Sequence, residues 1–426
     1  MDATTTARPT LLRRLLTRRD AMGAIAAQLT QALGSFLLQV IVARELGASG
    51  LGMFALLFGV VVLATAVSTG LVGDALTVLD RHDPGIRAAL SRLWLIVPLA
   101  TAIVFFLASW TTGALGLGAA AAFAVAAAAF QAEDVARRSL MASLRFWRVV
   151  AVDVVAISVT LGYLVTLALQ GATVTVTTFV AALAVGQVAG LAVGVVVTPS
   201  NERLLLHWRG ARMREVLTFG GWRAGQQLVR PSMLAGSRFL LLATAGAAVL
   251  GQVEAARVYL APAMLVVQGA GSYLLASYAR ESDAPLRQLL RRADRTSATL
   301  LASSLLIGLV AAFLAPTLGP VITDSQFDLP LPSVVGWAVY SASIAAVMPY
   351  ASLAAVRGVQ TRVVTLRMLD SLLSLLLLLV GLLVLDIPGS WAPWLISVGS
   401  FVGGVLCRTY VLVPLRRRAE AGVVAG

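Results

Sequence analysis

The sequence predicts an all-α polytopic membrane protein with twelve transmembrane helices. Of its 426 residues, 59% are hydrophobic and only 12% are charged, and the excess of apolar residues extends along the whole chain. A soluble domain needs more polar sequence to cover its surface. A spanning segment must satisfy its backbone hydrogen bonds internally, so apolar runs without the alternation of a membrane β-strand are expected to be helices.

Twelve apolar runs are long enough to cross the hydrocarbon core, which takes about 20 residues. They lie near 21–43, 51–73, 90–110, 114–132, 149–170, 173–198, 219–243, 250–276, 297–319, 332–356, 368–386 and 391–413. With an even number of spans, the two termini lie on the same side of the membrane.

The positive charges predict which side that is. The formal net charge of +13 is carried by arginine, and outside the predicted spans only Arg44 falls in an outer loop when the N-terminus is placed in the cytoplasm. Positively charged loops are typical of the cytoplasmic side, so both termini are expected there. Arginines between apolar spans do not indicate nucleic acid. Within residues 1–20, the stretch LLRRLLTRR from Leu11 combines four leucines with four arginines. This composition predicts a basic amphipathic segment on membrane lipids.

The residues of metal and catalytic sites are scarce. Cys407 is the single cysteine, and His82 and His207 are the only histidines. No spacing suits a metal, and we find no P-loop, HExxH motif or nucleophile elbow. We therefore expect no metal, no cofactor and no enzymatic activity.

The chain shows signs of an internal duplication. At an offset of 199 residues, LGASGLGMFAL from Leu46 matches AGAAVLGQVEA from Ala245, aligning Gly47 with Gly246 and Gly52 with Gly251. An even number of spans per half gives both halves the same orientation. The predicted parts are the basic segment 1–20, an N-lobe at 21–208, a C-lobe at 209–415 and a cytoplasmic tail at 416–426.

Span seven contains three arginines, in GGWRAGQQLVRPSMLAGSRFLL from Gly220. Arg223, Arg230 and Arg238 lie on one side of the predicted helix and cover about 22 Å of its length. Each costs about 2.5–3.5 kcal/mol at the centre of a bilayer, so we expect them to face a water-filled cavity. The alternative is pairing with acids, and Arg223 could also simply mark the membrane interface. Pro231 suggests a kink or an interruption of this helix.

Other polar residues are candidates for the same cavity. Span one presents four of them within about 80° on a helical wheel, and spans seven and ten add three. The candidates are Gln28, Gln31, Ser35, Gln39, Gln226, Gln227 and Tyr340. Hydrogen bonds between helices are the alternative for the glutamines, and ordinary packing is the alternative for the tyrosine.

The predicted spans contain few acidic residues. A cavity lined by arginine therefore suits an anionic substrate, because guanidinium binds phosphate or carboxylate bidentately. Glu254 is a possible proton or cation coupling site, although an ion pair with Arg257 is the simpler interpretation. Ion pairs are also expected for the remaining acids in or near the spans, Glu133, Asp134, Asp153 and Asp370.

Three stretches resemble bacterial polysaccharide flippases: LGASGLGMFALLFGVVVLATAVSTG, RRSLMASLRFWRVVAVDV and SRFLLLATAGAAVLGQVEAARVYLAP. These flippases of lipid-linked oligosaccharides belong to the multidrug/oligosaccharidyl-lipid/polysaccharide exporter superfamily, which also contains multidrug and toxin extrusion exporters and lipid II flippases. The resemblance implies two six-helix lobes around a central cavity and alternating access between the two sides of the membrane.

The resemblance also implies a substrate, an oligosaccharide on a polyprenyl diphosphate, exported across the bacterial cytoplasmic membrane for cell-surface polysaccharide synthesis. Arg223, Arg230 and Arg238 would then hold the diphosphate. We expect a monomer, with other polysaccharide-assembly proteins as candidate partners. The alternatives are a cation-coupled multidrug exporter and a lipid II flippase, which usually carries two further helices. A polymerase or glycosyltransferase would need larger loops, and a scaffold would leave the arginines of span seven unexplained.

Overall fold

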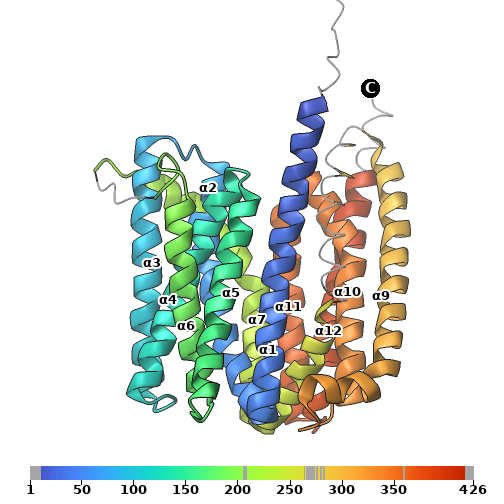
Figure 1. The fold of residues 1–426 in the computed structure, drawn as a ribbon. Coiled ribbons are helices and arrows are strands. Elements are labelled where there is room, and N and C mark those ends of the chain that lie inside the picture. Colours follow the sequence, from blue (N-terminus) through green and yellow to red (C-terminus); the bar gives the residue numbers. More distant parts are fainter. Residues whose placement is uncertain are drawn as a thin grey trace, which may run out of the picture. The chain divides into compact units, whose positions relative to one another are not determined.

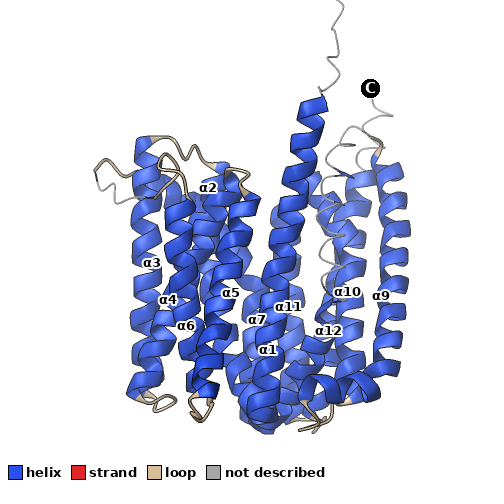
Figure 2. Cartoon of the chain, in the orientation of Figure 1, coloured by secondary structure: helices blue, strands red, loops and turns tan. Residues whose placement is uncertain are grey.

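The computed structural model describes residues 11–204, 209–262, 284–357 and 360–417, together with positions 264, 274, 277, 278 and 281. In these parts of the chain the ordered elements are all helices, and none is a strand (Figure 2). The predicted all-α class is therefore confirmed.

Figure 1 shows the described helices in the order in which they follow along the chain. They are α1 (Leu11–Ser68), the π-helix η1 (Thr69–Gly73), α2 (Asp74–Val78), α3 (Pro84–Thr111), α4 (Leu117–Ala142), α5 (Phe146–Leu169), α6 (Val176–Val197), α7 (Met213–Tyr259), α9 (Leu286–Thr323), α10 (Leu331–Val356), α11 (Gln360–Leu383), the 3₁₀ turn η2 (Gly389–Trp391), α12 (Ala392–Leu406) and the π-helix η3 (Cys407–Leu412). The helix α7 continues through Pro231 without interruption, and its only non-helical residue is Gly246.

The length and composition of the helices agree with a membrane protein. Ten helical segments in the described residues are long and apolar enough to cross a bilayer. The first, Met22–Val78, contains the first two predicted spans. The second half of the predicted span 250–276 lies largely outside the described residues, so the number twelve stays a prediction.

The chain divides into two compact units, and neither is one continuous segment. Unit 1 contains residues 1–37 and 64–225, and unit 2 contains residues 38–63 and 226–426. Parts of α1 and α7 therefore belong to each unit. The predicted lobes at 21–208 and 209–415 stay a prediction, because the compact units assign 38–63 and 209–225 differently.

Two glycines at corresponding positions of the proposed repeat turn the chain. Gly47 has φ 63° and ψ −166°, and Gly246 has φ 84° and ψ 171°. This region of backbone space is readily open only to glycine. Five residues after each of these turns lies another glycine, at a contact too close for a side chain. A Cβ on Gly52 would strike the carbonyl oxygen of Ala247, and a Cβ on Gly251 would strike the carbonyl oxygen of Ala48. The reciprocal contact supports the duplication.

Unit 2 has an apolar core that surrounds the polar residues described below. Leu250, Val334 and Leu378 are fully buried in it, and Trp337 donates its indole N–H to the Val253 carbonyl oxygen at 2.8 Å. The core draws on α7, α10, α11 and α12. Polar side chains between these helices are therefore held by rigid packing.

Candidate functional site

Arg238 lies in a closed network of charges in unit 2. Its Nε donates to Glu254 Oε1 at 2.7 Å and its Nη2 donates to Oε2 at 3.2 Å. Arg257 donates to Glu254 Oε2 at 2.6 Å and to Gln39 Oε1 at 2.8 Å. One carboxylate thus binds two guanidinium groups, and the second of these also binds a glutamine from α1.

This network is almost inaccessible. Glu254 is 2% exposed, Gln39 and Arg238 are buried as well, and only the Arg257 side chain, 24% exposed, reaches the surface. Arg238 is therefore paired with an acid, which was the alternative to a position in a water-filled cavity. Gln39 makes a hydrogen bond between helices, which was the alternative for the glutamines. Buried charges persist when they are paired and hydrogen-bonded. The roles of Arg238 in diphosphate binding and of Glu254 in coupling stay predictions, which these ion pairs weaken.

Arg223 also has a carboxylate partner, and it belongs to unit 1. Its Nε lies 2.8 Å from Asp74 Oδ2, on α2. The contact follows from close packing, because Cβ atoms on Gly70 and Gly220 would meet the backbone of Ala224 and Leu71. The diphosphate-binding role of all three arginines stays a prediction, and the pairing of Arg223 with Asp74 weakens it. A position on one helix face does not determine which element lies opposite.

Arg230 differs from the other two arginines. It is exposed, and its Cζ lies 5.5 Å from the centre of the Tyr340 ring. Tyr340 is buried and packs edge-on against Trp337, with 5.3 Å between ring centres. Among the described residues, no carboxylate lies within ion-pairing distance of Arg230. The two predicted site residues Arg230 and Tyr340 are thus brought together.

The structure adds two residues to this group that the sequence did not single out as a site. Arg367 and Asp370, on α11, are near enough to Arg230 for their charges to interact with it. Asp370 Oδ1 accepts a hydrogen bond from Ser371 at 3.1 Å. Arg367 was assigned to a cytoplasmic loop because span eleven was predicted to begin at 368, whereas the helix begins at Gln360.

The remaining predicted cavity residues are spread over both units. Gln28 and Gln31 are exposed and Ser35 is half-buried, all on the part of α1 in unit 1. Gln226 and Gln227 are half-buried on the part of α7 in unit 2. Their assignment to one cavity stays a prediction.

Unit 1 contains a buried group of charges of its own. Arg137 Nε lies 2.6 Å from Asp153 Oδ1, and Arg138 Nε lies 2.6 Å from Asp134 Oδ2. Glu133 is buried beside them. The predicted ion pairing is thus confirmed for Asp134 and Asp153. Among the described residues, no group of three or more potential ligands could hold a metal ion.

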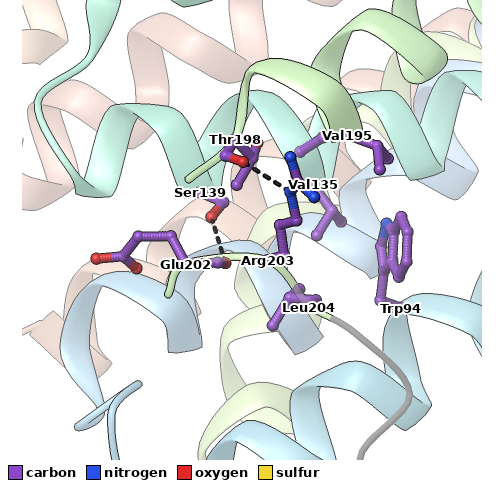
Figure 3. Close-up of a pocket in the computed structure, with 9 residues that line it drawn as sticks. Trp94, Val135, Ser139, Val195, Thr198, Glu202, Arg203 and Leu204 are labelled. Atoms are coloured by element: carbon purple, nitrogen blue, oxygen red, sulfur yellow. Dashed lines mark hydrogen bonds between the residues drawn. The ribbon is translucent and has the colours of Figure 1, made fainter. Parts of the chain in front are cut away.

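Unit 1 also contains a small pocket beside α4. Figure 3 shows Trp94 on α3, Val135 and Ser139 on α4 and Val195 on α6 around it, and the segment after α6 closes it. Arg203 donates from Nε to the Thr198 carbonyl oxygen at 2.8 Å across its edge. The volume of about 40 Å³ holds a few water molecules and no large substrate.

Known structures share this fold, although no protein-family model and no curated protein sequence matches the chain. An inward-facing multidrug resistance MATE family transporter of the MOP superfamily superposes with a TM-score of 0.65 at 15% identity, covering 93% of this chain and 98% of that chain. Its outward-facing counterpart gives 0.61 at 14% identity, covering 94% and 96%. A MOP superfamily transporter from Pyrococcus furiosus, whose reversed pocket polarity suggests a different function, gives 0.63 at 15%, covering 95% of both chains.

At such low identity these likenesses show the fold. The chain has the fold of the MATE transporters, as predicted, and this fold together with the ten apolar helices among the described residues supports a multi-pass membrane protein. The similar structures are transporters rather than enzymes. The polysaccharide branch of the superfamily stays a prediction.

Proposed function

We propose that this protein is a membrane exporter that works by alternating access and carries a polyprenyl-diphosphate-linked oligosaccharide across the bacterial cytoplasmic membrane, for cell-surface polysaccharide synthesis. The fold supports the transport part, because solved transporters of this fold include inward-facing and outward-facing conformations. The nature of the substrate depends on the charges of the chain itself.

The observation that carries the proposal is the environment of Arg230. It lies in a helix of membrane-spanning length, it is exposed, and its described contact is the face of Tyr340. A cation–π contact orients a guanidinium group without neutralising it, so the group can still bind an anion. Phosphate accepts paired N–H donors from one guanidinium, which makes a diphosphate a fitting ligand.

A cation-coupled multidrug exporter fits the fold equally well, and a lipid II flippase would carry the same diphosphate chemistry. A site for cationic drugs would need carboxylates that are available to the drug. Glu254, a candidate, instead binds Arg238 and Arg257. The charges of unit 2 therefore favour an anionic substrate.

The test replaces Arg230 in the native bacterium. We expect Arg230→Ala to abolish export of the lipid-linked glycan and to make its lipid-linked intermediate accumulate, while the amount of protein in the membrane is unchanged. Arg362→Ala, which removes an exposed arginine from α11, is the matched control and should export normally. Normal export by Arg230→Ala would contradict the proposal, as would efflux of cationic drugs with no glycolipid phenotype.

We also propose that the N- and C-termini lie in the cytoplasm and that the protein works as a monomer, with other polysaccharide-assembly proteins as candidate partners. The orientation is supported by the arginines, which avoid the predicted outer loops apart from Arg44. Reporter fusions at the two termini test it: alkaline phosphatase activity at either one would show that the orientation is wrong.

A further inference from the structure

Arg367 is exposed although it lies on the side of α11 that faces the protein. Ser374 and Leu378, seven and eleven residues further on, fall within about 20° of Arg367 on the helical wheel. They are 1% and 0% exposed. Leu376 lies on the opposite side of the helix and is 55% exposed. Arg367 therefore does not belong to the outer, apolar side of α11, although its side chain is exposed.

Arg230 on α7 shows the same pattern at the same spacing. Ser237 and Leu241 lie seven and eleven residues further on, again within about 20° of the arginine, and both are buried. Phe239 lies on the opposite side and is exposed. Both arginines are thus exposed while the residues that follow them on the same helix face are buried.

The two arginines belong to one group of charges in unit 2. The helices that carry them pack against each other, because a Cβ on Gly236 of α7 would lie 3.2 Å from Leu375 Cδ2 of α11. Both arginines are near enough to Asp370 for the charges to interact, and Arg230 lies over the ring of Tyr340 on α10. A Cβ on Gly403 of α12 would lie 2.8 Å from Asp370 Cβ, so the acid is held against that helix. Two guanidinium groups near one carboxylate leave an excess of positive charge.

We propose that Arg230 and Arg367 form the two arms of one binding site for a pyrophosphoryl group, and that Asp370 is a resident counter-ion whose charge opposes the binding of that anion. The inference rests on the proposed function, since it assigns the substrate diphosphate to these residues. Each of the two phosphoryl groups takes one guanidinium. Arg238 is excluded because Glu254 occupies its Nε and Nη2 donors.

The geometry predicts whether each substitution weakens or strengthens the binding of pyrophosphate. Loss of either arm removes charge-assisted hydrogen bonds, and loss of the acid removes an opposing charge. We expect Arg367→Gln and Arg230→Gln each to weaken pyrophosphate binding by about tenfold or more, and Asp370→Asn to strengthen it by several-fold. Arg362→Gln is the control, because it removes the same charge about 140° away around the same helix.

The experiment measures calorimetric binding of inorganic pyrophosphate to the full-length protein in phosphatidylcholine nanodiscs. Size-exclusion profiles and thermal midpoints establish that each variant is folded. Equal affinities for wild type and Arg367→Gln would overturn the inference, as would weaker binding by Asp370→Asn. An equal loss in Arg362→Gln would overturn it too, because the effect would then be one of total charge.

Two further measurements complete the experiment. The first identifies the source of the anion, and the second distinguishes failure of the proposed function from failure of the proposed site. Phosphatidylglycerol in the nanodisc should compete poorly with pyrophosphate, and competition of equal strength would make this a phospholipid headgroup site and overturn the assignment. If pyrophosphate binds as expected but Arg230→Ala exports glycan normally, the proposed function fails while the site stands. If export fails in Arg230→Ala but Arg367→Gln binds pyrophosphate like wild type, the site fails alone.

Discussion

Arg238 and Arg230 lie on the same helix, two turns apart, and their surroundings are opposite. Arg238 is buried, and Glu254 occupies its Nε and Nη2. Arg230 is exposed, and the aromatic face of Tyr340 orients it. One charge is thus balanced by a carboxylate, whereas the other stays exposed beside an aromatic ring. The comparison teaches that an intramembrane arginine indicates a binding site only when its partner leaves donors available.

Unit 1 extends the comparison. Arg137 is buried and pairs with Asp153, as Arg238 pairs with Glu254. Such closed pairs hold helices together, and their charge does not reach a ligand. The exposed pair Arg230 and Arg367 is the exception among the intramembrane arginines discussed above.

The largest effect is expected when the closed network of Arg238 loses its acid. Glu254→Gln leaves Arg238 and Arg257 facing each other with no balancing charge, and removing one partner of a buried pair typically costs about 3–5 kcal/mol. We expect the free energy of unfolding to fall by this amount, measured by SDS-induced unfolding in mixed micelles.

An exposed ion pair provides the control for this prediction. Arg292 and Glu281 lie 2.5 Å apart, with side chains 38% and 44% exposed. Glu281→Gln should change the free energy of unfolding by less than about 1 kcal/mol. If Glu254→Gln were as mild as this control, Arg238 would have to reach solvent, and the contrast with Arg230 would disappear.

A smaller effect is expected from crowding the closed network without removing a charge. A Cβ on Gly59 would strike Nη1 of Arg238, which Glu254 prevents from moving away easily. Gly59→Ala should therefore cost about 1–3 kcal/mol of unfolding free energy. Gly225→Ala, where no atom lies within 4 Å of the added Cβ, should be close to neutral. Equal stability of the two variants would show that Arg238 is mobile.

The smallest effect concerns the support of Arg230. Tyr340→Phe keeps the ring under the guanidinium and should leave glycan export unchanged. Tyr340→Leu removes a cation–π contact worth about 0.5–2 kcal/mol and should reduce export a few-fold. Export assays at matched protein levels measure both. A loss in Tyr340→Phe as large as that in Tyr340→Leu would assign the role to the hydroxyl group rather than to the ring.

The candidate site was only partly predictable. Arg230 and Tyr340 were found because polar residues in apolar spans are conspicuous. Arg367 was missed because a helix boundary placed by hydropathy alone fell eight residues too late, at 368 instead of Gln360, and the arginine was counted in a loop. The pairing of Arg223 with Asp74 was missed because Asp74 lies immediately after a predicted span and has no sequence relation to α7.

The sequence by itself determined the class of the protein, the helical nature of its spans and the correspondence of Gly47 with Gly246, where the structure then shows two turns. These properties depend on local chemistry: backbone hydrogen bonds in lipid, apolar length, and a backbone conformation readily open only to glycine. Only the tertiary structure decided which arginine binds a carboxylate and which stays accessible. The helical period places a side chain on a face, but the charge opposite it comes from a residue distant in sequence, and the packing of the helices alone brings the two together.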